Sequence, residues 1–290
     1  MTKPKVHTIP LTPKSITHRR LSRRATGSIT ASVQQSDKVY YGQITFGTGT
    51  PQNFDIDLDI GSGDLFVFGK NCVSPACNNH PKYDPDFDKT FSPIDRNFSI
   101  KYTDDTKISG IQARSLFELS VNGQTTPIMN LINNNKLDKP QFSFLLGREA
   151  DKSPSELTIG GSNPVRYRAD TLAFTNLVNN NTGAWEIPID NCVIDGEELN
   201  TQDHKNGIYS LPCEDVHEVG LIFSGMAWYI NLSDFTVEVT EDVCIGAVIY
   251  GNIIGSNTKW IIGSAFLKNV YTMFDQGNRQ VGFAEIVHNN

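Results

Sequence analysis

Apolar and polar residues alternate along much of this chain with a period of two, the pattern of β-strands with one buried face. The alternation is strict over 53–59 and 98–102. Similar but less regular patterns predict further strands at 38–46, 64–68, 108–121, 155–160, 184–190, 207–211, 219–223, 226–231, 234–239, 246–250, 270–275 and 279–286. Only 126–132, which has proline in its first turn, and 264–268 are predicted to be helical. The chain is therefore predicted to be mostly β.

Its length of 290 residues is enough for one large or two modest domains. The turn-rich sequence GGSNP at 160–164 predicts a boundary near the middle of the chain. No stretch approaches the ~20 consecutive apolar residues that a spanning helix needs, so we expect no membrane segment. The first residues, MTKPK, also lack the apolar run of a signal peptide.

Charge divides the chain into a basic arm and an acidic body. Residues 1–35 contain seven Lys or Arg and no acid, so the remaining 18 basic and 32 acidic residues give the body a net charge of −14. Such an arm can bind nucleic acid, but the acidic body would repel it. The alternative is a removable pro-segment, and the sequence HRRLSRR at 18–24 holds two dibasic pairs of the kind that processing proteases cut. We favour a pro-segment over 1–36 and expect no nucleic-acid partner.

The five cysteines favour disulfides over a metal site. Cys72 and Cys77 enclose a short loop that Pro75 would turn, and zinc would need two more ligands at suitable spacing, whereas the six histidines are scattered. Cys213 and Cys244 can pair across a hairpin, which leaves Cys192 over. We expect no metal and no other cofactor.

Three sequons place candidate glycosylation sites at Asn97, Asn180 and Asn231. Each motif is weak alone because sequons arise by chance. Together with the predicted disulfides they indicate an oxidising compartment.

The alternating strand at 53–59 ends in Asp59, and Gly61 and Ser62 follow in a tight turn. One interpretation is that Asp55, Asp57 and Asp59 form only the solvated face of a strand. The wider sequence FDIDLDIGSGDLFV at 54–67 resembles the first active-site segment of the pepsin-like aspartic peptidases, in which the strand ends in Asp-Thr-Gly-Ser.

Other segments resemble the same family in the same order. Residues 40–52 are similar to its first strand and turn, 72–77 to its small disulfide loop, 98–110 to its flap, and 260–275 to its closing segment. The arm at 6–14 resembles the basic pro-segment of fungal, rhizopuspepsin-like members.

This resemblance implies an all-β, bilobal acid-protease fold, with an N-terminal lobe at 37–163 and a C-terminal lobe at 164–290. It also implies a secreted or vacuolar monomer that acts on polypeptide substrates or binds peptide ligands. Asp59 would be catalytic, and Gly61, Ser62 and the flap residue Tyr102 would bind substrate.

The family's chemistry uses two aspartates that share one proton, one acting as base on a water and the other as acid. No second Asp-Thr-Gly segment is present in this chain. Its expected place holds only residues 200–206; Asp203 lacks the glycine turn, and Asp195 lies too early and lacks an intervening Ser or Thr. The flap strand likewise passes from Gly123 directly to the predicted helix, without the apolar Gly strand that supports the first aspartate loop in the family.

Both lobes are thus predicted to be shortened, and three hypotheses follow. The first is an aspartic endopeptidase by descent that is impaired or inactive. The second is a non-catalytic peptide-binding protein whose cleft is lined by Tyr102 and the apolar residues near Phe66 and Phe68. The third, a dimer in which each chain supplies Asp59, is disfavoured because the C-terminal half would obstruct a symmetric approach.

Overall fold

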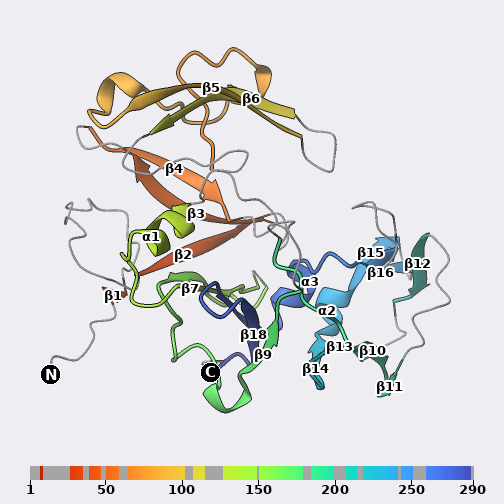
Figure 1. Ribbon diagram of the computed structural model, residues 1–290. Coiled ribbons are helices and arrows are strands. Elements are labelled where there is room, and N and C mark those ends of the chain that lie inside the picture. Colours follow the sequence, from red (N-terminus) through yellow and green to blue (C-terminus); the bar gives the residue numbers. More distant parts are fainter. Residues whose placement is uncertain are drawn as a thin grey trace, which may run out of the picture. The chain divides into compact units, whose positions relative to one another are not determined.

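The computed structural model describes thirteen segments: residues 7–8, 27–34, 39–46, 50–58, 65–101, 107–114, 127–148, 150–178, 184–198, 207–213, 218–240, 243–250 and 259–288. They form two compact units (Figure 1). The first unit comprises 1–32 and 39–139, and the second comprises 33–38 and 140–290. Strands dominate both units, which confirms the predicted all-β class.

The strands of the first unit form a sheet and a separate hairpin. In the sheet the order is β4-β3-β2, with β1 parallel to β2. The long antiparallel pair β5–β6 makes the hairpin (Figure 1). The elements of this unit are β1 His7–Thr8, β2 Gly27–Gln34, β3 Val39–Phe46, β4 Gln52–Asp57, the 3-10 turns Pro75–Cys77 and Pro85–Phe87, β5 Ser92–Lys101, β6 Lys107–Arg114 and α1 Pro127–Asn133.

A small aromatic core lies beneath β3 and β4. Phe46 meets Phe54 edge to face with ring centroids 5.5 Å apart, and Tyr83 packs on Phe46 at 5.8 Å. All three side chains are buried, with Leu65 and Val67 packed against them. The period-two alternation of β4 produces this arrangement because it turns Phe54 inward and its polar neighbours outward.

The second unit contains a five-stranded antiparallel segment of sheet in the order β8-β7-β17-β18-β9. Phe142 on β7 stacks on Phe274 of β17 at 4.8 Å, and Tyr167 stacks on Tyr271 at 4.6 Å. The strands are β7 Gln141–Leu145, β8 Ser155–Ile159, β9 Ala173–Asn176, β17 Tyr271–Asp275 and β18 Gln280–Ala284, with a 3-10 turn at Ala169–Thr171 before β9.

Two smaller antiparallel sheets complete the second unit. One has the order β11-β10-β13-β14 and the other β12-β16-β15. Their elements, with the two short helices, are β10 Asn191–Ile194, β11 Glu197–Glu198, β12 Gly207–Pro212, β13 Val219–Phe223, β14 Met226–Ile230, α2 Leu232–Phe235, β15 Thr236–Thr240, β16 Val243–Tyr250 and α3 Ser264–Leu267.

Most predicted elements are found within a residue or two of their expected bounds. Three predictions are wrong in whole or in part: 65–68 and 184–190 form no strand, and 234–239 begins as helix α2 before it becomes β15. Pro188 lacks the amide proton that a strand at 184–190 would need. Six strands were not predicted from the sequence: β1, β2, β7, β9, β10 and β11.

The predicted division into lobes stays a prediction. The compact units place 140–163 with the C-terminal half of the chain, whereas the resemblance assigned these residues to the N-terminal lobe. From the predicted arm at 1–36, the structure describes only the backbone of β1 and β2. Among the described residues, no helix is both long and apolar enough to cross a bilayer.

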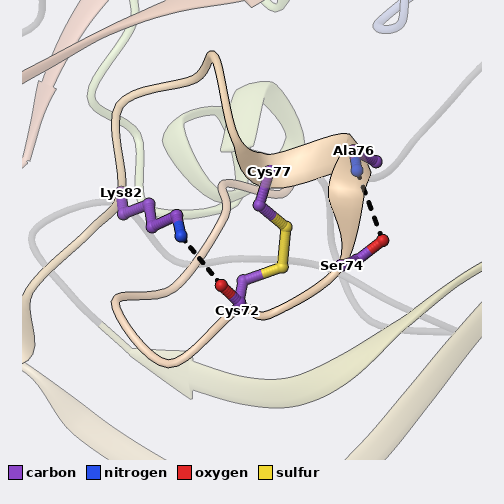
Figure 2. Close-up of a disulfide and its surroundings, with 5 residues drawn as sticks. All are labelled: Cys72, Ser74, Ala76, Cys77 and Lys82. Carbon is purple, nitrogen blue, oxygen red and sulfur yellow. Dashed lines mark hydrogen bonds between the residues drawn. A yellow bond between two sulfur atoms is a disulfide. The ribbon is translucent and has the colours of Figure 1, made fainter.

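Two disulfides are formed, between Cys72 and Cys77 and between Cys213 and Cys244. Figure 2 shows the first, whose loop is also held by Lys82, which donates to the Cys72 carbonyl at 2.8 Å. The second links the end of β12 to β16 with a Cα–Cα distance of 4.9 Å. Cys192 is a buried free thiol whose pKa is raised by burial.

The two disulfides are expected to contribute unequally to stability because they close loops of different length. With sequence separations of 5 and 31, loop entropy predicts a loss of about 2 kcal/mol for the Cys72→Ala/Cys77→Ala variant and about 4 kcal/mol for Cys213→Ala/Cys244→Ala. Urea unfolding of the two double variants measures the difference. A larger loss for the shorter loop would contradict the prediction.

Candidate active site

Strand β4 ends two residues before Asp59, the aspartate predicted to activate the attacking water. The structure describes this strand up to Leu58, whose amide donates to the Tyr40 carbonyl at 2.7 Å; Asp59, Gly61 and Ser62 lie outside the described residues. Asp55 and Asp57 are exposed on the outer face of β4, as the solvated-face interpretation predicted for them. The catalytic role of Asp59 stays a prediction.

The hairpin of β5 and β6 corresponds to the predicted flap. The two strands pair antiparallel from Ser92↔Arg114 to Lys101↔Lys107, and Tyr102, at the next position, lies outside the described residues. Gly110 has a packing role here, because a Cβ at this position would lie 2.8 Å from Cε1 of Phe98. The two strands on either side of the predicted flap tyrosine are therefore paired, and the flap role of Tyr102 stays a prediction.

The apolar residues predicted to line a cleft are only partly covered. Phe66 and Phe68 are half-buried, with ring centroids 6.3 Å apart, and Phe68 also contacts the His80 ring at 5.1 Å. These contacts lie within the first unit. Such contacts are compatible with a role in packing and with a role in ligand binding.

In the second unit, the segment that resembles the family's closing strand is open to solvent. Trp260 is 38% exposed and Ile261 is 60% exposed, and residues 259–263 form no strand. A Cβ added at Gly263 would meet no atom within 4 Å. Trp260 and Ile261 are therefore left exposed, and the Cα of Gly263 faces open space among the described residues.

Three buried aspartates are described, and each has a structural role. Asp88 accepts from the Tyr83 hydroxyl and from Thr90, and Asp234 is paired with two cations. Asp275 accepts from Gln141, Asn278 and Gln280 in the turn between β17 and β18. Within the described part of the chain, no buried aspartate is left with its carboxylate open to act as the second catalytic group.

Asp195, the nearest Asp-Gly pair to the missing motif, has a different role. It lies in the tight turn between β10 and β11 with φ of 52°, and Gly196 follows with φ of 82°. Two positive φ values in an Asp-Gly turn are typical of a β-hairpin. Its carboxylate also accepts from the Glu218 amide at 2.8 Å. Asp203 lies outside the described residues.

Stability at acid pH is expected to depend on Asp275. Burial alone would raise the pKa of this carboxyl, but hydrogen bonds from Asn278, Gln141 and Gln280 together hold the pKa below its ordinary value. A folded-state pKa below the unfolded value gives a stabilisation that is present above about pH 4 and is lost as the pH falls through the folded-state pKa.

Urea unfolding between pH 2 and 6 tests this expectation. The wild type should lose more stability on acidification than Asp275→Asn, which lacks the titrating group. Replacement of the exposed Asp151 by Asn serves as the control for loss of one carboxylate at the surface. Equal slopes for the wild type and Asp275→Asn would contradict the assignment.

The three sequons differ in their setting. Asn97 is exposed on β5, and Asn180 lies outside the described residues. Asn231 caps α2, since its Oδ1 accepts from the amide and the hydroxyl of Ser233 at 3.0 and 2.8 Å. Glycosylation at these positions stays a prediction.

Sequence reasoning missed a buried charged cluster in the second unit. Arg148 and Lys268 both pair with Asp234, and all three residues are less than 10% exposed. The only available signal was the position of Arg148 after Gly147 and the mainly apolar segment 142–146. Periodicity cannot reveal a partner 86 residues away.

Comparisons with known proteins support the resemblance over nearly the whole described chain. The family model for eukaryotic aspartyl proteases matches residues 39–116, 114–208 and 197–286. An aspartic protease from Phaffia rhodozyma is 28% identical over 343 positions, covering 92% of this chain and 81% of the relative. A probable vacuolar protease A from Arthroderma benhamiae (28%; 85% and 78% covered) and rhizopuspepsin from Rhizopus chinensis (25%; 90% and 81%) are similar over comparable lengths.

Each of these alignments has more positions than the number of residues that this chain contributes to it. For the Phaffia relative, 92% of 290 residues is about 267, so about 76 of the 343 aligned positions have no counterpart here. For rhizopuspepsin, 90% is about 261, which leaves about 67 of 328. The family model also matches in three pieces, whose joins fall at 114–116 and 197–208.

Proposed function

Because the chain belongs to the eukaryotic aspartyl protease family, whose substrates are polypeptides, we propose that it is a pepsin-like aspartic endopeptidase by descent with little or no peptidase activity as it stands. Asp59 is its one recognisable catalytic carboxylate. A lone carboxylate can activate water, but it lacks the partner that shares the proton and acts as acid. Each general acid–base step contributes ~10²–10⁴-fold in rate, so absence of the second aspartate should lower the rate of peptide hydrolysis by a factor of this size.

The observation that carries this proposal is the set of about 70 aligned positions that the relatives have and this chain lacks. One join of the family-model matches, at 197–208, spans the place where the second aspartate motif was expected. The other, at 114–116, lies a few residues before the predicted loss of the first lobe's supporting strand. Internal loss at these two places would remove one support from each lobe.

The exposed segment around Ile261 agrees with this account. In the family, each aspartate loop is threaded beside an apolar-apolar-Gly strand, and the sequence WIIG at 260–263 resembles that strand. Exposure of Trp260 and Ile261 is the outcome expected when the loop that should cover them is absent.

The remaining assignments follow from the family and from the cysteines. We propose a secreted or vacuolar location, supported by the two disulfides, which persist in oxidising compartments. One relative is named a probable vacuolar protease. The arm at 1–36 is proposed as a pro-segment, and the mature chain as a monomer without nucleic-acid or membrane partners.

An acid-pH protein digestion assay tests the loss of activity. The full chain and the chain after removal of the basic arm are compared with Asp59→Asn and with Asp55→Asn, an exposed aspartate on the same strand. We expect no cleavage above the Asp59→Asn background. Cleavage that Asp59→Asn abolishes and Asp55→Asn preserves would overturn the proposal, and so would a transcript that contains both missing segments in frame at codons 123–127 and 200–207.

A second candidate is a non-catalytic peptide-binding protein. The retained β5–β6 hairpin favours it, because this hairpin corresponds to the flap that covers bound peptide in the family. This function predicts saturable binding of extended apolar peptides at acid pH without cleavage. A flat titration of folded protein would exclude it.

A further inference from the structure

A polar pocket of about 270 Å³ opens within the second unit. It lies between the end of β7, the start of α2 and the residues that follow α3 and β18. Its polar lining consists of Arg148, Asp151, Asn231, Lys268, Asn269 and His288. The pocket belongs to the second unit, whereas Asp59, the recognisable aspartate of the proposed peptidase function, belongs to the first.

Arg148 brings unused donors to this pocket. Its side chain is 11% exposed, and its Nε donates to Asp234 at 2.8 Å while Nη2 donates to Asn269 Oδ1 at 2.6 Å. Among the described residues, Nη1 has no hydrogen-bond partner, since the Asp151 carboxylate is 3.9 Å away. A guanidinium is always charged, so a largely buried one with free N–H groups favours an acceptor that carries negative charge.

The nearby carboxylate and amide hold this guanidinium in place. Asp234 accepts from Arg148, from Lys268 Nζ at 2.6 Å and from Asn269 Nδ2 at 3.2 Å, so one buried carboxylate serves two cations. The Asn269 amide is oriented in turn, because it donates to the Ala265 carbonyl and accepts from the Asn231 amide. The donors are therefore preorganised before any ligand arrives.

We propose that this pocket binds a small oxyanion, a phosphate or the carboxylate of a small organic acid, through Nη1 of Arg148. Charge-assisted hydrogen bonds from a guanidinium to such oxygens are short and strong. Asp151 lies at the same guanidinium with its side chain 60% exposed. Its charge competes with the ligand.

Calorimetric titration and thermal unfolding of the full chain test the site. Phosphate, sulfate, acetate and citrate are compared with chloride at constant ionic strength. We expect saturable binding of one oxyanion per chain and a melting temperature raised by about 3–6 °C at ten times Kd. Competition between phosphate and citrate shows whether they share the site, and their relative Kd values identify the preferred class.

Two variants locate the binding. Asp151→Asn removes the competing charge and should tighten binding about two- to fivefold. Glu197→Gln, the same charge change at an exposed residue of β11 outside the pocket, should leave Kd unchanged. Arg148→Lys keeps a cation for Asp234 but removes the Nη1 donors, and should weaken binding at least about tenfold.

The site would be disproved by binding no stronger than that of chloride, or by a Kd that responds equally to Asp151→Asn and Glu197→Gln. If Arg148→Lys does not fold, the comparison of these two surface variants still decides the question. Because none of these measurements involves proteolysis, failure here leaves the proposed peptidase ancestry untouched, and the converse also holds.

Discussion

Insertion of the two segments that we predict to be missing, taken from a relative, is expected to turn this chain into an acid peptidase. The donor segments are the parts of rhizopuspepsin that correspond to the predicted gaps after Gly123 and at 200–206. The second insertion supplies the aspartate that shares a proton with Asp59, and the first supplies the strand that supports the Asp59 loop. Since each general acid–base step is worth ~10²–10⁴-fold, kcat/KM should rise at least about 100-fold above the unmodified chain.

Three controls make the result specific. Asp59→Asn in the double insertion should abolish the gain, and so should Asn in place of the inserted aspartate, because the pair acts as one unit. Each single insertion alone should give little activity, since one lobe would remain unsupported. Equal activity from the unmodified chain, or from the double insertion with Asp59→Asn, would contradict this account.

A folding measurement distinguishes failed chemistry from failed assembly. Trp260 is 38% exposed in the present chain, and an inserted aspartate loop should cover it together with Ile261. Tryptophan emission should then shift to shorter wavelength in the insertion at 200–206. An inactive insertion with shifted emission would point to chemistry, whereas unshifted emission would show that the loop has not docked.

Local patterns predicted those parts of the fold that depend on one strand and its turn. The alternation at 53–58 correctly placed Phe54 inside and Asp55 outside. The predicted strands 219–223 and 226–231 match β13 and β14, and in the structure Ser224 and Gly225, both with positive φ, form the tight turn between them. In such elements the neighbours in sequence are also the neighbours in space.

Several elements that depend on distant partners were not predicted from the sequence. β7, with the sequence QFSFL, alternates polar and apolar residues over only its first four positions, and its pairing with β17 joins residues about 130 positions apart. The apolar run at 65–68 forms no strand despite its composition, because it has no continuous ladder partner among the described residues. The candidate site was predicted through motif resemblance, whereas the Arg148 pocket depends entirely on contacts between distant segments.

The replacement Asp234→Asn is expected to cause the largest loss of stability of any single substitution considered for this chain. Asp234 has a side chain only 2% exposed and pairs with both Arg148 and Lys268. Removing its charge leaves two cations in a buried setting without their shared carboxylate. Loss of one partner from a buried ion pair typically costs ~3–5 kcal/mol, because desolvation of the remaining charge is no longer offset.

This cost is measured by comparing the free energies of unfolding in urea of Asp234→Asn and Asp151→Asn, which carry the same chemical change. Both variants replace an aspartate beside Arg148 by its isosteric amide, but Asp151 is 60% exposed at 3.9 Å, so its loss should cost less than ~1 kcal/mol. The gap between the two variants therefore isolates the effect of burial. Equal losses would mean that water reaches the Asp234 cluster freely. The inference that Asp234 holds the Arg148 guanidinium rigidly, on which the oxyanion site depends, would then be wrong as well.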